Sequence, residues 1–209
     1  SASGRNAKRL LVTSAAPGEG KSLVASNLAA VFANDSQRTL LIDGDLRHPG
    51  HHKAFNITAE RGLSDFLAGL LTLPEIVHKT NVPNLDVIAA GRVPANASEL
   101  LGSARMRKLM EVACQEYDRV IIDSPPVTAV CDPLVLSPQV DGVIVVVHFS
   151  MVRRDVVSRT VQKLQAIGVP VVGAVLNNIN IQNYGYYYPY QYTYHYGKHH
   201  GEAVGASRT

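Results

Sequence analysis

Residues 15–22 read Ala-Ala-Pro-Gly-Glu-Gly-Lys-Ser. This stretch follows an apolar run of strand length, residues 10–14, and it precedes a segment whose apolar residues recur at helical spacing. In a P-loop, a glycine-rich turn between a strand and a helix points backbone N–H groups at phosphate oxygens. The general pattern begins with glycine, whereas this chain has Ala15 at that position. An ordinary glycine-rich turn is the alternative, but the strand and helix on either side favour a P-loop that binds a nucleotide.

The same motif assigns roles to particular side chains. Lys21 is expected to reach the β- and γ-phosphates of ATP, and the Ser22 hydroxyl is expected to ligate Mg²⁺. Asn177 ends the last predicted strand and is a candidate contact for the adenine edge, although a C-cap role would explain it equally well. The predicted nucleotide-binding residues are Pro17, Gly18, Glu19, Gly20, Lys21, Ser22, Leu23 and Asn177.

Aspartates follow two further apolar runs. Asp43 and Asp45 come after residues 39–42, and Asp123 comes after residues 119–122. Because ligands bind at the carboxyl ends of parallel strands, these carboxylates are expected beside the P-loop. A lone aspartate at such a place is more often a helix cap or a turn residue, but three beside a P-loop favour a common site.

A magnesium ion prefers oxygen ligands and takes few of them from protein. Ser22, Asp45 and Asp123 are the predicted set, acting directly or through water. Asp43 is then available as a base for an incoming hydroxyl, although Asp43 and Asp45 could exchange roles. Together with Lys21, these aspartates are the predicted catalytic residues.

The rest of the chain alternates strand-like runs with helical periodicity, which is typical of βαβ units and a mainly parallel sheet flanked by helices. Residues 98–117 are expected to form one long helix, and the first helix is expected to bury Val24, Leu28, Val31 and Phe32. His48, His51 and His52 follow the first acidic run and are interpreted as solvated loop residues. Residues 1–183 are therefore predicted to be one α/β domain.

Composition narrows the class of protein. The net charge is +3 and the basic residues are scattered, which gives no support for nucleic-acid binding. The two cysteines have neither a disulfide framework nor a metal-ligand spacing. No apolar run reaches the roughly 18 residues needed to cross a bilayer, so the chain as given is expected to be soluble.

The C-terminal part has a different composition. Residues 184–196 hold eight of the nine tyrosines, namely Tyr184, Tyr186, Tyr187, Tyr188, Tyr190, Tyr192, Tyr194 and Tyr196. With almost no aliphatic residues, residues 184–209 have no core face and are expected to form a flexible tail. The tyrosines are interpreted as phosphate acceptors, and a sticky aromatic segment is the alternative.

Four motifs in this order resemble those of the bacterial tyrosine kinases (BY-kinases) that regulate capsule and exopolysaccharide synthesis. They are the P-loop, three apolar residues followed by Asp43, Asp45 and Arg47, the apolar-Asp-x-Pro run at residues 121–125, and the tyrosine cluster. Two more segments, residues 62–67 and 94–101, also look like that family, so the resemblance covers nearly the whole chain.

The resemblance implies a P-loop NTPase fold of the MinD/ParA type and a tyrosine autokinase that uses ATP and Mg²⁺. It also implies a ring-shaped homo-oligomer in which one tail enters a neighbour's active site, a membrane-embedded polysaccharide co-polymerase segment or activator, and a tyrosine phosphatase. The expected location is cytoplasmic, at the inner face of the bacterial plasma membrane. Arg47 would steer phosphates or pair with Asp45. The alternatives are a MinD/ParA-type switch ATPase, which usually carries lysine where this chain has Ala16, and a non-catalytic ATP-binding scaffold of an export complex.

Overall fold

A computed structural model describes residues 7–179. The chain divides into two units, Ser1–Ile179 and Asn180–Thr209, and the second unit, with all eight tyrosines of the predicted tail, lies outside the described residues. The strands are β1 (Arg9–Ser14), β2 (Thr39–Asp43), β3 (Val77–Lys79), β4 (Leu85–Ile88), β5 (Arg119–Asp123), β6 (Gly142–His148) and β7 (Val171–Asn177). The helices are α1 (Lys21–Asn34), α2 (His51–Ala54), α3 (Leu63–Leu67), α4 (Leu73–Ile76), α5 (Ala97–Leu101), α6 (Ala104–Glu116), α7 (Asp132–Leu136), the 3₁₀ turn Ser137–Gln139 and α8 (Arg154–Ala166).

The seven strands form one sheet in the order β3-β4-β2-β5-β1-β6-β7. Only β3 is antiparallel to its neighbour, which confirms the mainly parallel sheet. Strand β1 lies between β5 and β6, and β5 separates it from β2. The carboxyl ends of β1, β2 and β5 therefore lie at one edge of the sheet, with Asp43 directly opposite Asp123 in the register.

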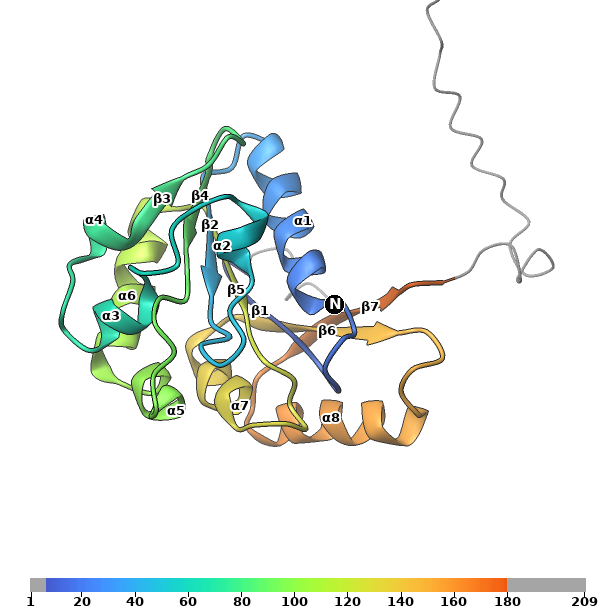
Figure 1. The fold of residues 1–209 in the computed structure, drawn as a ribbon. Helices are drawn as coiled ribbons and strands as arrows, with labels where there is room; N and C mark the ends of the chain where they lie inside the picture. The colour runs from blue at the N-terminus through green and yellow to red at the C-terminus, as the bar shows by residue number, and fades with distance from the viewer. Residues whose placement is uncertain (1–6, 180–209) are drawn as a thin grey trace, which may run out of the picture. The chain divides into compact units, whose positions relative to one another are not determined.

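Helices cover both faces of the sheet (Figure 1). Successive residues of a strand point to opposite faces, so Leu11 of β1 joins one buried cluster while Leu10 and Val12 join the other. Residues of α1, together with Phe55 and Ile57 just after α2, belong to the second cluster, and residues of α3, α5, α6, α7 and α8 belong to the first. Apolar side chains on both faces hold the site-bearing edge in place.

The buried stripe of α1 differs from the prediction. Its fully buried residues are Ala25, Ala29 and Ala33, and Val31 is 62% exposed. Val24, Leu28 and Phe32 are only partly buried against the same cluster. Alanines spaced four apart let the helix approach the strands closely, while larger residues flank the contact.

The single helix predicted for residues 98–117 is wrong, because the segment forms α5 and α6 with a break at Gly102 and Ser103. The Ser103 hydroxyl accepts a hydrogen bond from the backbone N–H of Met106 at 3.2 Å and so caps α6. The buried residues of α6 are Met106, Leu109, Met110 and Ala113, which lie at helical spacing on one face.

Candidate functional site

The loop between β1 and α1 has the backbone geometry of a phosphate cradle. Gly18 and Gly20 have φ angles of +82° and +89°, a region that glycine adopts without strain. A Cβ atom on Gly20 would lie 2.1 Å from Nδ2 of Asn177. The loop thus turns tightly against β7 and delivers its chain into the N-terminus of α1 at Lys21.

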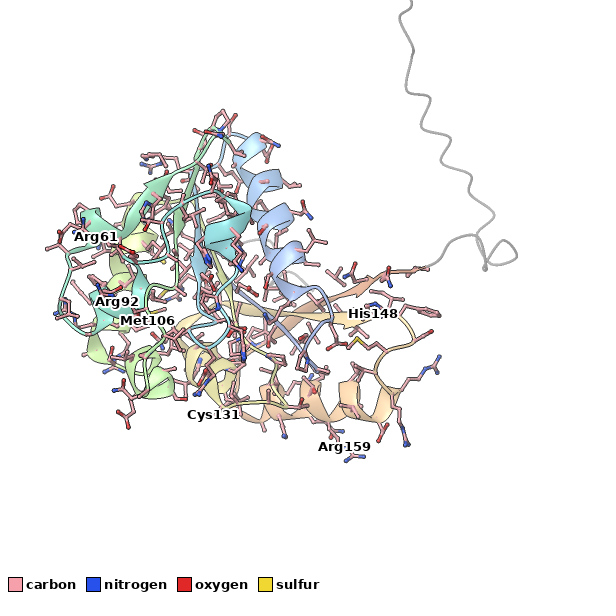
Figure 2. The ribbon with its side chains drawn as sticks, viewed as in Figure 1. Arg61, Arg92, Met106, Cys131, His148 and Arg159 are labelled. Atoms are coloured by element: carbon pink, nitrogen blue, oxygen red, sulfur yellow. The ribbon has the colours of Figure 1, made fainter. Side chains whose placement is uncertain are left out.

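Glu19 braces this loop from inside. Its side chain is fully buried; Oε2 accepts a hydrogen bond from the Ala16 N–H at 2.6 Å and Oε1 accepts one from the His148 N–H at 3.1 Å. Figure 2 labels His148 at the end of β6 beside the loop. Of Glu19, only the backbone is therefore available to a nucleotide.

Asn177 also contacts the loop. Its Nδ2 donates to the carbonyl oxygen of Glu19 at 3.0 Å, across 158 residues of sequence. The Asn177 side chain therefore fixes the P-loop to the last strand. Neither the adenine-contact hypothesis nor the C-cap hypothesis included this contact with the loop.

We expect Glu19→Ala to lower the free energy of unfolding by roughly 2 to 4 kcal/mol, because two backbone N–H groups lose their acceptor. Urea unfolding measures the change. Glu60→Ala is the control, because Glu60 is exposed, and it should stay within about 0.5 kcal/mol of the unmodified chain. Equal stabilities for the two variants would contradict the bracing role.

Lys21 lies at the centre of the acidic edge. Its Nζ is 3.1 Å from Oδ2 of Asp45, 3.9 Å from Oδ2 of Asp123 and 3.2 Å from the Ser22 hydroxyl, to which it donates. Asp45 also accepts the His48 N–H at 3.0 Å. Residues predicted from three separate motifs therefore share one site of a few ångströms.

Asp43 lies next to this group and is fully buried. Its Oδ2 accepts the N–H groups of Gly50 and His51, both at 3.1 Å, and its Oδ1 has no hydrogen-bond partner among the described residues. Burial raises the pKa of Asp43, the charge of Asp123 adds to the rise, and His51 and the two backbone bonds oppose it. A carboxylate with a raised pKa and a free oxygen is suited to accept a proton.

His51 is not a solvated loop residue, so that interpretation is wrong. The residue is 1% exposed, and its Nε2 lies 3.0 Å from Oδ2 of Asp123. Burial lowers the pKa of His51, but the hydrogen bond to Asp123 and the charge of Asp43 outweigh burial and raise it. No local pattern in the sequence indicates this contact, because 72 residues separate the partners.

Arg47 does not pair with Asp45. Its guanidinium makes two hydrogen bonds to Asp132, at 2.8 and 3.1 Å, and one to the Ser98 hydroxyl at 3.1 Å. Arg47 thus ties the acidic loop after β2 to the start of α7 and to α5.

The donor set fits a divalent cation. Asp45 and Asp123 bring two carboxylates to a buried edge, with Asp43 next to them and Lys21 in contact with Asp45 and with the Ser22 hydroxyl. Oδ1 of Asp43 and Oδ1 of Asp123 are buried and have no hydrogen-bond partner within residues 7–179. Buried carboxylate oxygens of this kind are costly unless an ion or a ligand satisfies them.

A cavity of about 580 Å³ opens at the ends of β6 and β7. A smaller cavity of about 320 Å³ lies away from the P-loop, between α6 and β3. The lining of the larger cavity includes His148, Met151 and Leu176. Both the His148 N–H and Asn177, the residue after Leu176, hold the P-loop, so this hollow adjoins the phosphate cradle. Its volume lies in the range of small-ligand pockets.

Three comparisons place the chain among known proteins. A family model described as "ParA: NUBPL iron-transfer P-loop NTPase" matches residues 5–204. The tyrosine-protein kinase YwqD of Bacillus subtilis is 38% identical over 186 residues, which is 88% of this chain and 78% of that protein. The tyrosine-protein kinase etk of Escherichia coli is 42% identical over 81% of this chain, but the match spans only 23% of etk.

Solved structures agree with these matches. The kinase domain of Escherichia coli ETK has a TM-score of 0.81 and 36% identity, covering 98% of this chain and 73% of that one. The septum site-determining protein MinD of Pyrococcus horikoshii has a TM-score of 0.69 at 19% identity, covers 81% and 69% of the two chains, and shows a shared fold alone. None of the helices described in residues 7–179 has the length and apolar character needed to cross a bilayer.

Proposed function

The chain belongs to the bacterial tyrosine kinases within the ParA-type P-loop NTPases, and from this premise we propose that it transfers the γ-phosphoryl group of Mg·ATP to tyrosines of its own C-terminal cluster. One observation carries the proposal: Lys21, Asp45 and Asp123 meet beside the P-loop, with the proton-accepting Asp43 next to them. The fold and the P-loop family support nucleotide binding directly.

In the proposed reaction the P-loop backbone holds the phosphates and Lys21 neutralises the charge of the β- and γ-phosphates. The tyrosine oxygen forms a bond to the γ-phosphorus while the bond between that phosphorus and the bridging oxygen of ADP breaks. Asp43 receives the phenol proton through its free Oδ1. Orientation and charge neutralisation supply most of the rate in such transfers.

Ser22, Asp45 and Asp123 would hold Mg²⁺, directly or through water. When bound, the ion supplies charge neutralisation at the phosphate oxygens. Lys21 lies at the same edge, where Asp45 and Asp123 balance its charge. Those contacts hold the lysine beside the P-loop, where it would neutralise the charge of a bound phosphate.

The proposal extends to the setting of the protein. Relatives are named as kinases, and one is described as a kinase in the cps region of Klebsiella pneumoniae. We propose regulation of capsule or exopolysaccharide export, with phosphorylation between neighbouring subunits of a homo-oligomer, a membrane-embedded activator, a tyrosine phosphatase as the reversing enzyme, and a location at the cytoplasmic face of the plasma membrane.

Incubation with γ-labelled ATP and Mg²⁺ tests the proposal. Label on tyrosines within residues 184–196 is the expected result. Release of free phosphate without protein label would identify a switch ATPase instead, and neither product would leave an ATP-binding scaffold. Mass spectrometry before and after phosphatase treatment locates the modified residues.

Replacing Asp43 separates catalysis from stability. An acid whose pKa is raised by folding is stabilising when protonated, below its ordinary pKa, and that stability is lost as pH rises through the raised value. At neutral pH, Asp43→Asn should therefore raise the melting temperature by at least about 2 °C, while tyrosine labelling falls by about 100-fold or more.

Calorimetry from acid to neutral pH measures the first effect, and the gap between Asp43→Asn and the unmodified chain should widen as pH rises. Glu111→Gln is the control, because Glu111 is exposed. A lower melting temperature for Asp43→Asn at neutral pH would contradict the burial penalty, and full labelling would remove Asp43 from the role of base.

A further inference from the structure

His51 connects two parts of the site that no sequence motif links. Its ring is buried, with Nε2 3.0 Å from Oδ2 of Asp123 at the end of β5 and Nδ1 3.1 Å from the hydroxyl of Ser26 on α1. Its backbone N–H also donates to Asp43. One residue at the start of α2 thus contacts the helix that follows the P-loop and both acidic strand ends.

The partners determine what each ring nitrogen does. An ionised carboxylate accepts hydrogen bonds only, so Nε2 carries a hydrogen and donates it to Asp123. Nδ1 can then accept the hydrogen of the Ser26 hydroxyl. Because a hydroxyl can also accept, Ser26 serves Nδ1 equally when the ring is protonated, so both ring nitrogens have partners in either state and the ring orientation is fixed from both ends.

This arrangement matters for the carboxylate it holds. Asp123 is 1% exposed; Oδ2 takes the histidine hydrogen bond, while Oδ1 has no hydrogen-bond partner among the described residues. Hydrogen bonds from a second layer of residues orient metal-binding carboxylates, and their loss typically costs about 10- to 100-fold in metal affinity. A fixed Oδ2 leaves Oδ1 as the oxygen available to an ion or to an ion-bound water.

We propose that His51 is a positioning residue that holds Asp123 for the nucleotide-bound divalent cation, with Ser26 fixing the imidazole from the opposite end. The assignment rests on the proposed function for its link to phosphoryl transfer, but its direct consequence is cation affinity. His51 acts through Asp123 and does not itself ligate the ion, because its Nε2 hydrogen points at the carboxylate.

Two substitutions of His51 test its two hydrogen bonds separately. In His51→Gln the amide nitrogen can reach the position of Nε2 and still donate to Asp123. In His51→Asn the shorter amide matches Nδ1, so it can contact Ser26 but not Asp123. Both replacements are polar and smaller than the ring, which makes them matched probes. His78→Gln on the antiparallel edge strand β3 is the control for the same chemical change away from the site.

The experiment titrates Mg²⁺ into the full chain bound to a fluorescent ADP analogue. We expect His51→Asn to weaken the apparent Mg²⁺ affinity by about tenfold or more and His51→Gln to stay within about threefold of the unmodified chain. Nucleotide affinity measured in EDTA should be the same for both variants. A purely structural role would instead shift the melting temperatures and leave the Mg²⁺ dependence alone.

Unchanged Mg²⁺ affinity in His51→Asn, or equal losses in the two variants, would overturn the proposal. Nitrogen coupling to bound Mn²⁺ in pulsed EPR would also overturn it, since such coupling would make His51 a direct ligand.

A second variant is used if both His51 variants melt more than about 5 °C below the unmodified chain. The Mg²⁺ affinity of Ser26→Ala is then measured in the same titration. A two- to threefold loss there supports the proposal and an unmodified affinity contradicts it. Because the titration needs no tyrosine transfer, absent autophosphorylation would overturn the kinase proposal alone.

Discussion

Lys21→Met is expected to reduce tyrosine labelling by at least about 100-fold, because it removes a positive charge aimed at the transferred phosphate. The fold should survive, since Lys21 contacts Asp45 and Asp123 at the ligand edge and lies in neither buried apolar cluster. Labelling with γ-labelled ATP gives the rate, and circular dichroism checks the fold.

Lys53→Met is the matched control for the loss of one lysine. Lys53 is exposed on α2, close to the site in sequence, and its replacement should leave labelling unaltered. Autophosphorylation that persists in Lys21→Met would overturn the assignment of the whole phosphate site, because the proposed roles of the aspartates and of Ser22 all require a phosphate bound at this lysine.

Replacing all eight tyrosines of residues 184–196 by phenylalanine is expected to remove essentially all protein label while ATP binding remains. The hydroxyls are the proposed acceptors, and phenylalanine keeps the aromatic character of the segment. If the segment served only to bind other molecules, the eightfold variant would keep the same amount of protein label as the unmodified chain. Phosphopeptide mapping by mass spectrometry and a nucleotide-binding assay measure the two effects.

Tyr117 provides the contrast within the same chain. It follows α6, its hydroxyl donates to Oδ2 of Asp86 at 2.8 Å, and burial followed by that hydrogen bond raises the pKa of its phenol. A half-buried phenol already bound to a carboxylate is a poor nucleophile, so Tyr117→Phe should keep full labelling. Phosphate found on Tyr117, or label remaining in the eightfold variant, would contradict the assignment of the acceptors.

Several structural predictions were possible from the sequence because local signals were strong. The apolar runs that end at Ser14, Asp43 and Asp123 are strands in the structure. A buried parallel strand reads as an unbroken apolar run, and the residue after it must lie at the carboxyl edge. The P-loop and the convergence of Lys21 with the aspartates follow from that rule alone.

Other predictions failed where the sequence pattern fits two local structures equally well. In α1 the sequence offers both an alanine line and a line of larger apolar residues, and the distance between helix and sheet selects Ala25, Ala29 and Ala33. In residues 98–117 the helical period continues through Gly102, and the Ser103 cap interrupts it.

The positions of the parallel strands, the phosphate loop and the set of acidic residues are all readable from the sequence alone, since each depends on neighbours within one strand–turn–helix unit. The tertiary structure alone decided which side chains support them: Glu19 meets His148, Arg47 meets Asp132 and His51 meets Asp123 over separations of 129, 85 and 72 residues. Such pairs depend on strand order and on the packing of loops at the sheet edge. No local spacing encodes them, because a buried polar group accepts whichever partner the assembled fold brings within hydrogen-bonding distance.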